Sequence, residues 1–197
     1  MTNLLRTTLA LLITSSLSCA SQQAKTAKES NAAKLIQNNS LSGWQGNKKN
    51  WSVKDGIITG ESTKEEPLRH NTFLIWEKEL PDNYQFTFKY KFLSPKGNSG
   101  IQYNSKVLDS KKFIVAGMQA DFETGNTYSG ILYEEKGRGI LAQRGTTVTV
   151  NEKGKKIKTG KLDVPKGVDK STDNDGWQSY KVVFLDNKAI HIINGFA

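Results

Sequence analysis

An aromatic side chain stands at every second position of the segment Tyr84-Gln85-Phe86-Thr87-Phe88-Lys89-Tyr90-Lys91-Phe92. Successive side chains of a β-strand point to opposite faces of a sheet, so the five rings share one face and the polar residues share the other. Aromatic rows also serve as platforms for sugars, but five rings facing water would expose a large apolar area. The segment therefore predicts a half-buried strand whose aromatic face packs in a core.

Further short strands are predicted on both sides of this segment. The dipeptide Asp55-Gly56 supplies the positive φ of a tight hairpin between residues 51–54 and 57–59. Residues 72–77 are apolar enough to form a fully buried strand. Other strands are expected at 113–123, 128–134, 146–150, 178–185 and 189–193. No segment has a helical period, so the chain is predicted to be an all-β sandwich.

Two of the segments also predict a polar surface. In residues 118–123 the alternation directs Met118, Ala120 and Phe122 to one face, and residues 101–104 alternate in the same way. The opposite face is expected to hold Gln102, Asn104, Gln119, Asp121 and Glu123. If the two strands are neighbours, amides and carboxylates gather on one surface, as the many hydroxyls of a carbohydrate require.

Four motifs in a fixed order carry a family resemblance. They read GNSGIQY at 97–103, GMQAD at 117–121, YSGILYEE at 128–135 and GRGILAQRG at 137–145. With them the chain resembles the 3-keto-disaccharide hydrolase domain family, formerly DUF1080, from about Ser42 to Gly195 and most weakly between Thr146 and Asp175. The resemblance implies a concanavalin A-like jelly-roll β-sandwich.

The resemblance also implies a 3-keto-glycoside as the substrate. A ketone at C3 acidifies the hydrogen on C2, so a general base can remove it and the C1 substituent can leave by elimination. Addition of water to the resulting enone completes a net hydrolysis. Two other interpretations stay open: a jelly roll that binds glycans without cleaving them, and a remnant with neither activity. The number of carboxylates favours the enzyme.

The motifs supply the candidate site residues. Asp121, Glu123 and Glu134 are the candidate acids or bases, although a single strand carboxylate more often faces solvent. The candidate substrate-binding residues are Gln102, Asn104, Gln119, Arg138 and Arg144. Both arginines lie beside glycines that permit close approach of a ligand, and an exposed arginine in a turn explains them equally well.

No cofactor is predicted. His70 lies in a polar loop and His191 in a strand, and both are expected to be structural rather than catalytic. The spacing of histidine and cysteine matches no transition-metal site. A hard divalent cation held by Asp121, Glu123 or Glu134 stays open.

The first part of the chain predicts export. Residues 1–19 contain Arg6, a short apolar run and Cys19, the chain's only cysteine, as a bacterial signal peptide does. We expect Cys19 to be lipidated, which would give a periplasmic or cell-surface lipoprotein held at the membrane by its lipid alone; cleavage near Ala20 is the alternative. Residues 20–40 are predicted to be a flexible tether, and 41–197 a single sandwich domain.

The chain has a net charge of +9, much of it in one segment. The lysines of this segment are Lys153, Lys155, Lys156, Lys158, Lys161, Lys166 and Lys170. We expect a solvated excursion between strands, since charge runs usually face water, and attraction to an acidic polysaccharide or membrane surface is the alternative. A nucleic-acid partner is not expected, because no helical recognition element is visible.

The sequence stops at Phe196-Ala197, whereas relatives in the resembled family continue with a turn and one or two strands. The jelly roll is therefore expected to be truncated at its C-terminus, with unpaired backbone groups at a sheet edge.

Overall fold

A computed structural model describes residues 35, 39–65 and 67–197. The predicted signal segment 1–19 with Cys19, and most of the predicted tether 20–40, lie outside the described residues. Contacts divide the chain into Met1–Asn38 and Asn39–Ala197, and the strands named below all belong to the second unit. Within the described ranges, no helix has the length and apolar character needed to cross a membrane.

The described residues form strands and one turn of 3-10 helix. In chain order the elements are β1 (Trp44–Gln45), β2 (Trp51–Lys54), β3 (Ile57–Gly60), β4 (Ile75–Trp76), β5 (Tyr84–Tyr90), β6 (Asn98–Asp109), β7 (Ile114–Glu123), β8 (Leu132–Glu135), β9 (Gly139–Ala142), β10 (Thr146–Val150), β11 (Lys156–Lys161), η1 (Val168–Lys170), β12 (Gln178–Leu185) and β13 (Lys188–Ile193). All the pairings between strands are antiparallel.

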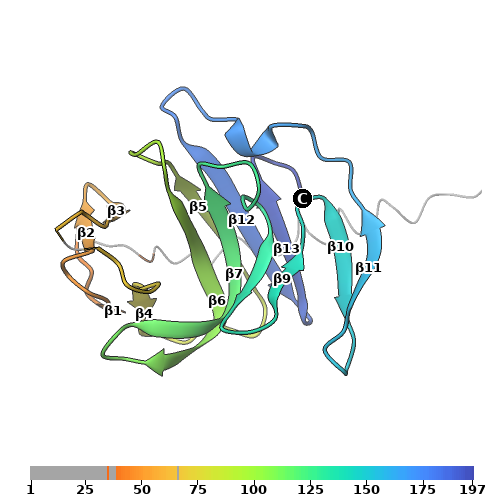
Figure 1. Ribbon diagram of the computed structural model, residues 1–197, viewed down its shortest axis with the longest axis horizontal. Helices are drawn as coiled ribbons and strands as arrows, with labels where there is room; N and C mark the ends of the chain where they lie inside the picture. The colour runs from red at the N-terminus through yellow and green to blue at the C-terminus, as the bar shows by residue number, and fades with distance from the viewer. Residues whose placement is uncertain (1–34, 36–38, 66) are drawn as a thin grey trace, which may run out of the picture. The chain divides into compact units, whose positions relative to one another are not determined.

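Two antiparallel sheets pack face to face and make the sandwich (Figure 1). One has the strand order β13-β12-β5 and the other the order β6-β7-β8-β9. The expected all-β sandwich is therefore confirmed. β13 is an edge strand, and its Ile193 bridges to Phe196. That further strands would complete the fold stays a prediction.

The aromatic row of β5 lies in the core between the sheets, as its alternation predicts. The Phe88 ring stacks on Tyr180 of β12 with 5.2 Å between centroids and an interplanar angle of 8°. The Tyr90 ring reaches across to Phe122 of β7, with 4.2 Å between centroids. Each large apolar side chain buried in this way contributes about 1.5–3 kcal/mol, so these rings supply much of the driving force that joins the sheets.

Two of the predicted N-terminal elements have different outcomes. The hairpin of β2 and β3 is confirmed, with φ of 51° at Asp55 and 74° at Gly56. The fully buried strand expected at 72–77 is wrong. Only β4 is regular there, and it pairs with the two-residue β1 outside the core between the sheets, so its side chains are half-buried.

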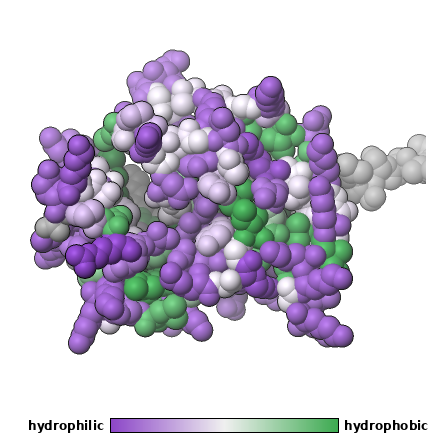
Figure 2. All heavy atoms as spheres, viewed as in Figure 1, coloured by the Kyte–Doolittle hydropathy of each residue, from purple (hydrophilic) through white to green (hydrophobic). Residues whose placement is uncertain are grey.

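The lysine-rich segment is more regular than expected. Its central part is β11, which pairs with the predicted strand β10 to form an exposed ribbon beside β9. Lys156 Nζ donates to the carbonyl oxygen of Ile140 at 2.8 Å and so attaches the ribbon to β9. Figure 2 shows that this side of the molecule is mostly hydrophilic, with apolar side chains in separate small patches. All seven lysines are exposed, and an acidic partner for them stays a prediction.

Candidate functional site

One face of the four-stranded sheet is polar, and it lies opposite the core. The register pairs Gln102 with Gln119 and Gln119 with Tyr133, so these three side chains share a face. By the same alternation, the members of this polar face on β6, β7 and β8 are Gln102, Gln119, Asp121, Glu123, Tyr133 and Glu135. The expected gathering of amides and carboxylates on neighbouring strands is therefore present.

Hydrogen bonds join the polar face into a row. Ser105 Oγ donates to Gln102 Oε1 at 2.9 Å, and Gln102 Nε2 donates to Gln119 Oε1 at 3.0 Å. Gln119 Nε2 then donates to Asp121 Oδ1 at 2.5 Å. Gly100 makes room for this row, because a Cβ there would come within 2.7 Å of Gln119 Cγ. The row ends on the carboxylate of Asp121.

Asp121 is the carboxylate best suited to exchange a proton near neutral pH. It is only 6% exposed, and burial raises its pKa to about 6. The hydrogen bond from Gln119 opposes this rise, and the charges of Glu135 and Glu123 add to it. A base whose pKa lies just below the working pH is mostly ionised and still accepts a proton readily.

The sequence reasoning missed two members of the polar face, Tyr133 and Glu135. Glu135 is 5% exposed, accepts a hydrogen bond from Asn71 Nδ2 at 3.2 Å, and lies 3.3 Å from Lys136 Nζ. Because Leu132 packs against the core, strict alternation along β8 could have predicted that residues 133 and 135 lie on the polar face.

Glu134 lies on the other side of β8 and is paired with Arg138. Arg138 Nε and Nη2 each donate to a different oxygen of the Glu134 carboxylate at 2.6 Å, and the Arg138 backbone N–H donates to it at 2.7 Å. The hydrogen bond from Arg138 lowers the pKa of Glu134 to about 2. These two predicted site residues thus close the turn between β8 and β9, and their roles in chemistry stay predictions.

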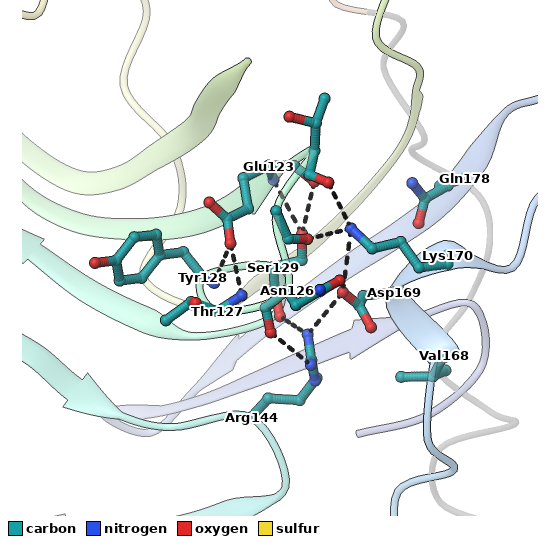
Figure 3. A network of polar contacts seen from close by, with 12 residues as sticks. Glu123, Asn126, Thr127, Tyr128, Ser129, Arg144, Val168, Asp169, Lys170 and Gln178 are labelled. Carbon is teal, nitrogen blue, oxygen red and sulfur yellow. Dashed lines mark hydrogen bonds and ion pairs between the residues drawn. The ribbon is translucent and has the colours of Figure 1, made fainter. Parts of the chain in front are cut away.

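Glu123 borders Asp121 but is engaged with a loop. Its Oε1 accepts backbone hydrogen bonds from Thr127 at 2.6 Å and from Tyr128 at 2.8 Å (Figure 3). Glu123 therefore holds the loop that follows β7, and its predicted part in catalysis is untested.

Arg144 contacts the same loop. Its Nη1 donates to the carbonyl oxygen of Ser129 at 2.5 Å and lies 3.3 Å from the buried Asp169 carboxylate of η1 (Figure 3). Lys170 Nζ donates to the carbonyl oxygen of Thr124 at 2.9 Å. The guanidinium is thus directed at the loop and η1, and a contact with substrate stays a prediction.

Asn104 does not lie beside Gln102. A bulge interrupts the register between Tyr103 and Lys106, and Asn104 has a φ of 46°. Its Oδ1 accepts a hydrogen bond from the Tyr84 hydroxyl of the facing sheet at 2.6 Å. The expected place of Asn104 on the polar face is therefore wrong, because the bulge breaks the alternation on which it was based.

His191 belongs to the core, in keeping with the structural role expected for it. Its Nδ1 lies 3.1 Å from the carbonyl oxygen of Ile131, which can only accept, so Nδ1 carries the hydrogen. Nε2 then accepts from the Tyr103 hydroxyl at 2.7 Å. Burial lowers the pKa of His191 to about 4. The ring is therefore neutral at physiological pH.

A metal centre has no ready ligand set within the described part of the chain, where no three His, Cys, Asp or Glu side chains come together to hold an ion. A hard cation bound at Asp121 or Glu123 stays a prediction.

Comparison with known proteins identifies the family to which the chain belongs. The family model of the 3-keto-alpha-glucoside-1,2-lyase-like domain matches residues 31–197, which include both sheets and the polar face. A search of curated proteins finds no match to the chain. The motifs at 97–145 and the sandwich that carries them agree with the family match. The chain belongs to the 3-keto-alpha-glucoside-1,2-lyase-like domain family.

Proposed function

We propose that the protein is an enzyme that cleaves 3-keto-glycosides by elimination across C1 and C2, followed by hydration. Family membership supports a carbohydrate substrate with a ketone at C3. The observation that carries the proposal is Asp121, a buried carboxylate with a pKa of about 6 at the end of a row of amides.

In the proposed reaction Asp121 is the general base. Its carboxylate takes the C2 hydrogen as a proton, and the electron pair left on C2 is stabilised by the C3 carbonyl as an enolate. The pair then forms the C1–C2 double bond while the C1–O bond breaks and its electrons leave with the alcohol. Addition of water places hydroxide on C1 and returns a proton to C2, which gives the net hydrolysis product.

Other members of the polar face have roles that follow from their chemistry. The amides of Gln102 and Gln119 both donate and accept, as the hydroxyls of a sugar ring require. The Tyr133 hydroxyl, on the strand next to Gln119, can supply a proton to the departing C1 oxygen. Burial is the main cause of the raised pKa of Asp121, and the negative charge of Glu135 adds to it.

Binding without cleavage is the second candidate function. The row from Ser105 through Gln102 to Gln119 favours it, because hydrogen-bonding groups in a row on a sheet can hold a glycan without any chemistry. The two functions differ in the behaviour of Asp121. Loss of its carboxylate should stop an enzyme and leave a binding protein largely intact.

The test is release of product from a 3-keto-disaccharide compared with its unoxidised parent sugar. We expect release only from the ketone, and a loss of about 100-fold for Asp121→Asn, as is typical when a general base is removed. Asp163→Asn, a change at an exposed aspartate outside the polar face, is the matched control and should have normal turnover. Binding of the ketosugar with no release by the unaltered protein would favour the second function.

We also propose that the enzyme works outside the cytoplasm, at the membrane surface. The signal-like segment 1–19 and the position of Cys19 support lipid attachment to that cysteine. A lipid anchor followed by the segment 20–40 would leave the sandwich domain free to reach soluble sugars.

A further inference from the structure

A cavity of about 450 Å³ lies away from the middle of the polar face, where three loops meet. Its lining residues are Asn47, Asn50, Pro67, Leu68, Arg69, His70, Thr72, Lys111, Lys112 and Phe113. The volume falls within the range of sites that hold small molecules. None of these residues is part of the polar face, so the proposed reaction gives none of them a role.

Specific hydrogen bonds fix the three loops. The Phe73 backbone N–H donates to the carbonyl oxygen of Phe113 at 3.1 Å, which fastens the loop before β4 to the turn between β6 and β7. Asp109 Oδ1 accepts from the backbone N–H groups of Lys111 and Lys112, each at 3.0 Å, so the turn presents two lysines side by side. Asn50 Nδ2 donates to the carbonyl oxygen of Glu61 at 3.0 Å and holds the third loop.

The charged residues that line this cavity are all basic. Arg69, Lys111 and Lys112 contribute positive charges and His70 an imidazole, while no acidic residue of the described chain lines the cavity. Lys112 lies 3.8 Å from Asp109, in an exposed ion pair. The side chains of Arg69, His70 and Lys111 have no hydrogen bond or ion pair with any described residue. Their donors are therefore available to a ligand.

We infer that this cavity binds an oxyanion, a phosphate, sulfate or carboxylate that is either free or carried on a sugar. A guanidinium fork and two ammonium groups are the donors that such groups favour. The half-exposed Leu68 and the Phe113 ring add an apolar wall of the kind that contacts the C–H face of a sugar. Asn71, in the same loop as Arg69, donates to Glu135 of the polar face, so a sugar in the cavity would lie next to that face.

This inference goes beyond the proposed function and does not depend on it. The test measures binding to the full chain at low salt, with inorganic phosphate, glucose 6-phosphate and glucose as the probes. We expect saturable binding of both phosphates with a Kd of about 1 mM, and no binding of glucose. Tighter binding of glucose 6-phosphate than of inorganic phosphate would identify a sugar substituent as the ligand, and equal binding a free anion.

Two double variants, each of which removes two positive charges, distinguish binding in this cavity from non-specific attraction of the anion to a basic protein. Lys111→Gln with Lys112→Gln should weaken phosphate binding about fivefold, since each exposed charge pair contributes a factor of a few. Lys153→Gln with Lys155→Gln, at exposed positions around the β10–β11 turn, should leave the Kd unchanged. A single Arg69→Gln change, which leaves the β6–β7 turn intact, should also weaken binding.

Three results would overturn the inference: no saturable binding of either phosphate at about 10 mM, ten times the expected Kd; equal weakening by the two double variants; or binding of glucose as tight as that of glucose 6-phosphate. Because the readout is binding, a protein without lyase activity can still pass the test, and an active enzyme can fail it.

Discussion

Replacement of Asp121 by Asn should stabilise the fold at alkaline pH. The pKa of Asp121 in the folded protein is about 6, above the ordinary value of 3.8, so the folded state binds this proton more tightly than the unfolded state does. Ionisation of Asp121 therefore costs stability in full above about pH 6, and the cost decreases as the pH falls and disappears below 3.8. Asparagine has nearly the same shape, keeps an oxygen that can accept from Gln119, and does not titrate.

The size of the effect follows from the shift of about two pKa units. Each unit corresponds to 1.36 kcal/mol, so ionisation of Asp121 costs about 3 kcal/mol at pH 8. The difference in unfolding free energy between Asp121→Asn and the unaltered protein should therefore change by about 2.5 kcal/mol between pH 4 and pH 8, in favour of the variant at pH 8, because the unfolded carboxyl is still partly ionised at pH 4. For a domain of this size, that is a relative change in Tm of about 5–10 °C.

The assay is denaturant unfolding of both proteins at several pH values, followed by tryptophan fluorescence. Asp163→Asn, at an exposed position, serves as the control and should have the pH profile of the unaltered protein. A constant difference between Asp121→Asn and the unaltered protein from pH 4 to pH 8 would refute the reasoning, because it would mean that Asp121 titrates normally in the folded state.

Three further predictions concern other residues. His191→Gln should remove an acid sensitivity of the fold. The pKa of His191 is lowered to about 4, so the folded protein does not bind a proton that the unfolded chain binds below about pH 6.5. Between pH 7 and pH 4, the unfolding free energy of the unaltered protein, measured with denaturant, should fall by about 3 kcal/mol more than that of the variant. Glu134→Gln should lower turnover less than tenfold and stability by about 1 kcal/mol or less, because Glu134 pairs with Arg138 away from the polar face; a loss of turnover as large as that of Asp121→Asn would place Glu134 in the site. Cys19→Ser should release the protein from membranes or block its processing, and mass spectrometry that finds a mature chain starting at Ala20 or later would contradict lipidation.

The parts of the fold that the sequence predicts are those fixed by local alternation. The aromatic row from Tyr84 to Phe92 defines its own buried face, and Asp55-Gly56 defines its own turn, since both signals lie within a few residues. The predicted strand at 72–77 was wrong because apolar composition does not reveal its partner, which is the short strand β1.

The candidate site was predicted only where the alternation continues without interruption. Gln119 and Asp121 lie where the period of two places them, as does Gln102 on the neighbouring strand. Asn104 does not, because a bulge precedes Lys106, and such an extra residue leaves no clear mark in the sequence.

Contacts between segments that are far apart in the chain could not be predicted from the sequence. The basic cavity requires three loops that are far apart in the chain, joined in part by the backbone bond from Phe73 to Phe113. No local pattern could have predicted that meeting.

Exchange of the C2 hydrogen tests the role of Asp121 most directly. A 3-keto-glycoside is incubated with the protein in D₂O, and deuterium at C2 of the recovered substrate and product is followed by NMR. We predict that the unaltered protein incorporates deuterium at C2, and that Asp121→Asn slows this incorporation about 100-fold while Asp163→Asn does not. Incorporation by Asp121→Asn at the rate of the unaltered protein would contradict the assignment of Asp121 as the base.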